Sequence, residues 1–236
     1  MEQLKYTDIF IDFDDTLYDT HGNASKALSE VFAYFNLNQH FATEEDFTTP
    51  YWKVNKELWD LYAHAKISRD ELIIERFRRP LSLGIDSPTR EYCLSVSDYF
   101  LQQCACKPDT IEGAHEAMQY LKSKGYRLHI CSNGFCEVQY KKLNASHMTD
   151  YFDTIILSEE AGANKPSEQF FNFALHKSKA QRSSTLMIGD NFDTDIMGAI
   201  NAGLHTMFFN RQPNEFKVPQ HIDYEIHSLH EIKWLL

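Results

Sequence analysis

The chain of 236 residues lacks an excess of positive charge and long apolar runs. Its formal net charge is −11, whereas proteins that bind nucleic acid through the phosphate backbone need a basic surface, so we expect no nucleic acid polymer as a partner. No apolar run approaches the ~20 residues of a membrane span. Met1-Glu2-Gln3 lacks the basic start and apolar core of a signal peptide. We therefore expect a cytoplasmic protein without a membrane partner.

Paired cysteines are also missing. The five cysteines form an odd set without CxxC spacing, which argues against both a disulfide framework and a structural zinc site. We interpret them as reduced thiols. The eleven histidines are scattered, and His227 and His230 come nearest to a ligand pair. Without further ligands nearby in the sequence, we expect these two histidines at the surface.

The stretch from Ile9 to Leu17, Ile-Phe-Ile-Asp-Phe-Asp-Asp-Thr-Leu, joins an apolar segment to acids. Apolar, β-prone residues surround Asp12, which predicts a buried parallel strand that ends where the carboxylates begin. Ligands of open α/β sheets bind beyond the carboxyl ends of the strands, so Asp12 and Asp14 lie where chemistry is usually done. One acid can attack or bind a metal while the other carries a proton. The alternative is a solvated acidic turn.

The segment 18–106 shows helical periodicity, with apolar residues at three-to-four spacing. Breaks are expected at residues 36–38, 49–50, 67–68, 83–84 and 107–108. The segment is rich in aromatic residues, including Trp52 and Trp59. At helical spacing such residues serve either as core packing or as a platform that stacks on a base. The sequence therefore predicts an inserted, all-helical domain.

From Pro108 onward, helical and strand patterns alternate, as in parallel sheets built from βαβ units. Strands are expected at 126–131, 154–157, 185–188, 205–209 and 224–226, and helices at 114–124, 137–143, 168–176, 194–201 and 229–235. We therefore predict an α/β protein whose core domain, residues 1–17 and 107–236, has a parallel sheet flanked by helices. The helical domain would span residues 18–106.

Two loops after predicted strands carry further polar groups. Ser132-Asn133-Gly134 offers a hydroxyl and backbone amides that can cradle a phosphate, although this tripeptide is also a common turn. Lys165 precedes a predicted helix. It is either a solvated lysine or the cation that a site with several carboxylates and a phosphate requires.

An acidic cluster follows the predicted strand 185–188. Asp190, Asp193 and Asp195 stand at a helix start, where capping requires only one acid. Taken in order, the polar sites resemble the four motifs of the haloacid dehalogenase (HAD) superfamily of phosphohydrolases: Asp12 with Asp14, Ser132, Lys165, and Asp190 with Asp195. The resemblance implies a HAD-like Rossmannoid core, and the insert looks like the C1-type helical cap of subfamily I.

Asp14 separates two reactions within that group. The L-2-haloacid dehalogenases lack the second acid of the first motif, because a halide leaving group needs no proton, whereas an alkoxide leaving group does. A closer resemblance is to the YjjG-like pyrimidine 5'-nucleotidases. It is based on Asp15, where relatives usually have glycine, and on segments 54–59, 132–135 and 158–166. Asn164 and the pair 191–192 depart from the expected pattern, which leaves the substrate open.

The resemblance implies a phosphate monoester hydrolase that works through an aspartyl-phosphate. Asp12 would attack the phosphorus, and Asp14 would protonate the leaving oxygen and later deprotonate the hydrolytic water. Ser132, the backbone amide of Asn133 and Lys165 would hold the transferring oxygens.

The same resemblance implies Mg²⁺ as the cofactor. Its ligands would be the Asp12 carboxylate, the Asp14 backbone carbonyl and Asp190, with Asp195 ligating directly or through water. Thr16 is expected to order the turn below the nucleophile rather than to touch the substrate.

The expected partner is a small phosphorylated metabolite, namely a nucleoside 5'-monophosphate, and the expected assembly is a monomer or weak homodimer. Trp52, Asn55 and Trp59 share one face of a predicted helix and would set specificity by stacking on a base and bonding its edge. The alternatives are a general sugar-phosphate or small-metabolite phosphatase, a phosphomutase on the same core, or a binding protein without catalysis.

Overall fold

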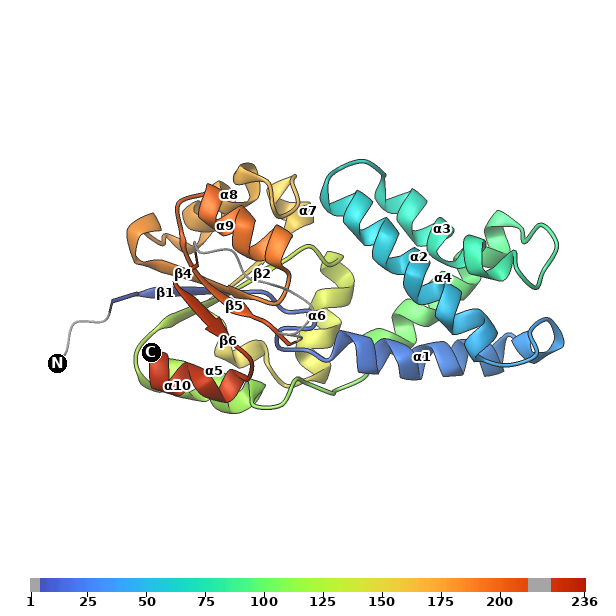
Figure 1. Cartoon of the computed structure of the whole chain (residues 1–236), viewed down its shortest axis with the longest axis horizontal. Helices are drawn as coiled ribbons and strands as arrows, with labels where there is room; N and C mark the ends of the chain where they lie inside the picture. Colours follow the sequence, from blue (N-terminus) through green and yellow to red (C-terminus); the bar gives the residue numbers. More distant parts are fainter. Residues whose placement is uncertain (1–4, 212–221) are drawn as a thin grey trace. The chain divides into compact units, whose positions relative to one another are not determined.

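The computed structural model describes residues 5–211 and 222–236 (Figure 1). The chain divides into two compact units, Met1–Thr20 with Pro108–Leu236, and His21–Lys107. We call them the core unit and the helical unit. Within the described ranges, no helix is long and apolar enough to cross a membrane.

A six-stranded, fully parallel sheet forms the centre of the core unit, with strand order β3-β2-β1-β4-β5-β6. The strands are β1 (Asp8–Ile11), β2 (Arg127–Ser132), β3 (Thr154–Leu157), β4 (Thr185–Gly189), β5 (His205–Phe209) and β6 (Tyr224–Ile226). The central β1 is buried on both faces, which explains the apolar run Ile9–Ile11 that follows its first residue, Asp8. The predicted parallel α/β fold is confirmed.

Helices cover both faces of the sheet. Alternate residues of each strand point to opposite faces, so Ile9 and Ile11 pack with α5 (Ala114–Ser123), α6 (Cys136–Ala145) and α10 (Ile232–Leu235). Phe10 points to the other face and packs with α8 (Glu168–Ser178) and α9 (Gly198–Asn201). Figure 1 shows α5 and α10 on one side of the strands and α8 and α9 on the other. The remaining short elements are η2 (Thr149–Tyr151), α7 (Ser158–Ala161), η3 (Arg182–Ser184) and η5 (Leu229–Glu231).

The helix after β4 differs from the expected single helix at 194–201. A π-helical turn, η4 (Phe192–Met197), comes first, and α9 follows it. The helix starts early because the side-chain oxygen of Asn191 accepts hydrogen bonds from the backbone of Asp193 and Thr194. The cap is thus an asparagine, not one of the aspartates. Single π turns of this kind are frequent at functional sites.

The helical unit contains α1 (Thr20–Tyr34), whose first residue belongs to the core unit, η1 (Leu37–Gln39), α2 (Glu45–Ala63), α3 (Arg69–Leu81) and α4 (Arg90–Ala105). Its own apolar core takes residues from all four α-helices, among them Val31, Tyr51, Phe77 and Phe100. A reciprocal capping box between Ser68 and Glu71 starts α3.

The break expected at residues 49–50 is wrong, because α2 runs through Pro50. Proline inside a helix costs about 3 kcal/mol. Two features offset this cost. Thr43 and Asp46 exchange hydrogen bonds at the start of the helix, and Phe47 and Tyr51 on either side of the proline are buried in the core of the unit.

Candidate active site at the carboxyl edge of the sheet

Asp12 and Asp190 follow the two central strands at the same edge of the sheet. Ile11 of β1 stands opposite Ile188 of β4, and the backbone N–H of Asp12 donates to the Ile188 carbonyl at 2.9 Å, which extends the ladder to the acid. The buried Thr16 joins the two loops. Its hydroxyl donates to Asp190 Oδ1 at 3.0 Å, and the Asp190 N–H donates to Thr16 Oγ1 at 3.1 Å.

A tight turn after Asp12 sends the two acids of the first motif to different partners. The backbone N–H groups of Leu17 and Tyr18 both donate to the Phe13 carbonyl. Asp15 sits in this turn with φ of 59°, the left-handed region that favours glycine. This conformation gives a physical reason for the glycine expected there in relatives, and aspartate is among the few other residues that tolerate it.

Lys165 is 2% exposed, and its ammonium bridges two carboxylates. Nζ lies 2.6 Å from Asp12 Oδ1 and 2.6 Å from Asp195 Oδ1. Burial alone would lower the pKa of Lys165, but the two carboxylates raise this pKa above its usual range. The lysine is therefore a permanent cation at the proposed nucleophile, and the solvated alternative does not apply.

Three carboxylates converge beside this lysine. Oxygens of Asp12, Asp190 and Asp195 lie within 4.8 Å of one another. Burial raises the pKa of Asp12 to about 7, with Asp195 and Asp14 adding to the rise and Lys165 opposing it. Burial and the neighbouring acids also raise the pKa of Asp190 well above its usual value. This donor set suits a hard divalent cation, which would relieve the repulsion between the acids.

Asp195 is held from both sides. Its Oδ1 contacts Lys165, and its Oδ2 accepts the backbone N–H of Asn191 at 3.1 Å. The carboxylate also lies against Gly189, where any Cβ would collide with it. The glycine at the end of β4 is therefore required by the close approach of Asp195, and Asp195 has less free coordination capacity than Asp190.

The end of β2 and the loop after it position the Ser132 hydroxyl and the loop that carries Lys165. Ser132 Oγ accepts the Gly134 N–H at 3.0 Å and a Gln139 side-chain N–H at 2.6 Å. With both lone pairs used, the hydroxyl proton of Ser132 is left to donate. The Asn133 side chain exchanges two hydrogen bonds with the backbone of Lys165, at 2.8 and 2.9 Å. The sequence pattern predicts a role only for the backbone amide of Asn133, whereas the structure adds one for its side chain.

Asp14 has partners that the sequence analysis missed. Its Oδ1 accepts from Thr20 Oγ1 at 2.6 Å and from Lys142 Nζ at 2.6 Å, and its Oδ2 accepts from Gln139 Nε2 at 2.7 Å. Burial would raise the pKa of Asp14, but Lys142 and the other donors keep this pKa below its usual value. A signal was present in the sequence. Gln139 and Lys142 fall at helical spacing beside apolar Val138 and Leu143, so two polar residues share a buried face of α6.

The three candidate specificity residues all lie on α2. Trp52 stacks on His21, with ring centroids 4.2 Å apart, and packs against the core of the helical unit. Trp59 contacts Tyr62 edge to face, and Asn55 is half-buried. Trp52 therefore contributes to packing, and the face that Asn55 and Trp59 share is the part of α2 that stays open to a recognition role.

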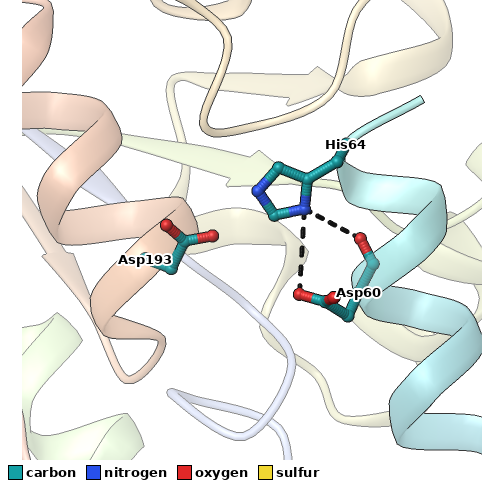
Figure 2. A group of neighbouring side chains, drawn as sticks. All are labelled: Asp60, His64 and Asp193. Atoms are coloured by element: carbon teal, nitrogen blue, oxygen red, sulfur yellow. Dashed lines mark hydrogen bonds and ion pairs between the residues drawn. The ribbon is translucent and has the colours of Figure 1, made fainter. Parts of the chain in front are cut away.

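Each of three histidines has its own partner. Figure 2 shows His64 at the end of α2, where Nδ1 lies 2.9 Å from the backbone oxygen of Asp60 and 3.7 Å from its carboxylate. Asp193, also drawn there, belongs to the core unit. His227 contacts the Asn210 carbonyl at 2.9 Å. His230 lies 4.0 Å from Glu112. His227 and His230 thus have separate partners. All five cysteines are free thiols.

Comparisons with known proteins indicate the family. The sequence model of the haloacid dehalogenase-like hydrolases matches residues 9–209. The chain is 31% identical to pyrimidine 5'-nucleotidase YjjG of Escherichia coli, over 99% of both proteins. It is 27% identical to pyrimidine 5'-nucleotidase PynA of Streptococcus pneumoniae, over 96% of this chain and 93% of that protein. The crystal structure of the putative HAD-hydrolase YfnB from Bacillus subtilis, bound to magnesium, superposes with a TM-score of 0.86 at 27% identity, over 98% of this chain and 99% of that one.

Proposed function

Because the chain belongs to the haloacid dehalogenase-like hydrolase family, we propose that it hydrolyses phosphate monoesters with Asp12 as the nucleophile. One observation carries the proposal. The Asp12 carboxylate lies at a strand end, in contact with a buried, charged lysine and beside two further acids. Lys165 contacts Oδ1 of Asp12, and Oδ2, which lies 3.3 Å from the Thr16 hydroxyl, keeps a lone pair for attack on phosphorus.

The positions of the side chains support the following steps. Asp12 attacks the phosphorus in line and forms an aspartyl-phosphate as the bond to the leaving oxygen breaks. The donors around Asp14 keep its pKa low in the free protein, so Asp14 takes up a proton when the anionic phosphate binds, because that negative charge favours the protonated carboxyl. Asp14 then gives this proton to the leaving oxygen and later takes one from the water that hydrolyses the intermediate. Ser132 donates its free hydroxyl proton to a transferring oxygen, as does the amide of Asn133, and Lys165 offsets the charge on these oxygens.

Mg²⁺ is the proposed cofactor. Asp12, Asp190 and the backbone carbonyl of Asp14 would hold it, and Asp195, whose oxygens already have partners, would act through water. When bound, the ion supplies positive charge that stabilises the phosphoryl oxygens. The magnesium in the YfnB structure supports this assignment.

Proton release on metal binding tests the carboxylates directly. The pKa of Asp12 is raised to about 7 in the metal-free protein. At about pH 6 Asp12 is therefore mostly protonated, and Mg²⁺, which binds the carboxylate, must displace at least one proton. Well above pH 7 the release from Asp12 disappears, so affinity should weaken as pH falls through 7. The number of protons released when Mg²⁺ binds is measured by calorimetry at about pH 6 in buffers of different ionisation enthalpy. An absence of proton release would contradict the assignment.

The proposed substrate is a nucleoside 5'-monophosphate, with the helical unit acting as the cap that selects it. The nucleotidase activity named for the relatives in E. coli and S. pneumoniae supports this choice. A turnover screen over nucleoside monophosphates and sugar phosphates tests it. Preference for sugar phosphates would favour a general small-metabolite phosphatase, and isomerisation of a sugar phosphate without release of phosphate would favour a phosphomutase.

A substitution on α2 tests base recognition. A hydrogen bond from Asn55 to the edge of a base is worth about 0.5–1.5 kcal/mol, so Asn55→Ala should lower kcat/KM for UMP and dUMP by up to about tenfold. The value for p-nitrophenyl phosphate, which has no base, should stay the same. The exposed neighbour Lys56→Ala is the matched control. An unchanged ratio of the two kcat/KM values in Asn55→Ala would remove this face of α2 from the proposal.

A further inference from the structure

Three donors occupy the two oxygens of the Asp14 carboxylate. They come from two elements, Thr20 at the start of α1, and Gln139 and Lys142, which lie one turn apart on α6. The Lys142 side chain is 7% exposed, and its ammonium also lies 5.1 Å from the centre of the Tyr18 ring. The carboxylate of Asp14 is therefore fixed in both position and plane, mainly by side chains of α6.

Gln139 also connects Asp14 to the phosphate loop. Its amide nitrogen lies 2.7 Å from Asp14 Oδ2 and 2.6 Å from Ser132 Oγ, so its two N–H bonds serve the two residues. Gln139 packs so closely on Gly134 that a Cβ at position 134 would overlap its side chain. The glycine of the Ser-Asn-Gly loop is thus needed to admit Gln139. One side chain of α6 fixes a group after β1 relative to a group at the end of β2.

We propose that Lys142 and Gln139 are positioning residues, with Lys142 orienting Asp14 for proton transfer to the leaving oxygen and Gln139 orienting Ser132 toward the transferring phosphoryl group. The inference rests on the proposed function, because it assumes the phosphatase role of Asp14. It adds two residues outside the four motifs. The two residues also differ in their expected effects, since Lys142 contacts Asp14, whereas Gln139 contacts both Asp14 and Ser132.

A comparison of two leaving groups distinguishes a positioning role of Lys142 from a structural one. The p-nitrophenolate ion leaves without help at neutral pH, whereas the more basic phenolate needs a proton. The parameter kcat/KM covers only steps up to departure of the alcohol, so the later attack of water does not affect it. General acid–base catalysis contributes 10²–10⁴-fold, so imperfect orientation of Asp14 should forfeit about tenfold or more.

The central experiment compares phenyl phosphate with p-nitrophenyl phosphate. Lys142→Met keeps the length of the side chain and removes its charge. This variant should lower kcat/KM for phenyl phosphate about tenfold more than for p-nitrophenyl phosphate. Lys142→Arg keeps the charge and donors, so it should recover most of the difference. Lys141→Met, at the adjacent exposed lysine, is the matched control and should change neither value.

Gln139→Met should show a different pattern. Loss of the hydrogen bond to Ser132 weakens the hold on the phosphoryl group that both esters share, so kcat/KM should fall for both. Asp14 keeps Thr20 and Lys142 as donors, so the extra loss on phenyl phosphate should be smaller than in Lys142→Met. Equal losses on the two esters in Lys142→Met, or no loss in either variant, would overturn the inference while the enzyme remained a phosphatase. If Lys142→Met does not fold, the double variant Lys142→Arg with Asp14→Asn takes its place. The same ratio of kcat/KM for the two esters in this double variant and in Lys142→Arg alone would overturn the inference. A wild-type protein that hydrolyses neither ester would overturn the proposed function itself.

Discussion

Asp12→Asn should abolish turnover of p-nitrophenyl phosphate while the protein remains folded. The amide nitrogen and oxygen of asparagine cannot form the acyl-phosphate, so the covalent route is lost and the rate should fall by several powers of ten. The fold should survive because asparagine has the same shape and Lys165 keeps its contact with Asp195 at 2.6 Å. Removing a carboxylate whose pKa burial has raised to about 7 also relieves repulsion among the acids.

The measurement is the single-turnover and steady-state rate with p-nitrophenyl phosphate, with thermal melting as the test of folding. Asp150→Asn provides the control, because it removes the same charge from an exposed residue of η2, before β3 and at the opposite edge of the sheet. A folded Asp12→Asn protein that keeps more than about a hundredth of the wild-type rate would exclude nucleophilic catalysis by this residue.

The fold was largely predictable because buried parallel strands are short, apolar and separated by helical patterns. The expected bounds of β3, β5 and β6 agree with the structure, and β1, β2 and β4 differ by a residue or so at their ends. The grouping of Asp12 with Asp190 follows from the same pattern, since parallel strands present their carboxyl ends at one edge of the sheet. Ser132 and Lys165 could be assigned to the same site because they lie at or beyond the ends of β2 and β3.

The contacts that depend on side-chain packing could not be predicted. Which face of α6 meets the turn after β1 is decided by tertiary packing, so helical spacing could indicate that Lys142 is buried but not that its partner is Asp14. The reciprocal bonds of Asn133 with the lysine loop require the actual path of both loops. The opposite error occurs at Pro50. Proline there predicts a helix break, but burial of Phe47 and Tyr51 keeps α2 continuous.

Removal of divalent metal should stop turnover completely, and Mg²⁺ should restore it. Three carboxylates crowd within 4.8 Å, and raised pKa values at Asp12 and Asp190 indicate that Lys165 does not balance their charge. EDTA should therefore abolish activity. Ca²⁺ should restore it poorly, because Ca²⁺ takes 6–8 ligands at about 2.3–2.6 Å, whereas Mg²⁺ is octahedral at about 2.0–2.1 Å.

Asp190 should set the concentration of Mg²⁺ that the enzyme needs. Asp190→Asn removes a charged ligand and keeps an oxygen within reach of Thr16, so the Mg²⁺ concentration for half-maximal activity should rise by about tenfold or more. Asp195→Asn should also affect Lys165 and hence activity at saturating Mg²⁺, because Asp195 contacts the ammonium directly. The two variants thus separate metal affinity from the charge balance at the nucleophile. Full activity after exhaustive chelation would show that these acids hold no metal needed for turnover, and an unchanged Mg²⁺ requirement in Asp190→Asn would exclude Asp190 as a metal ligand.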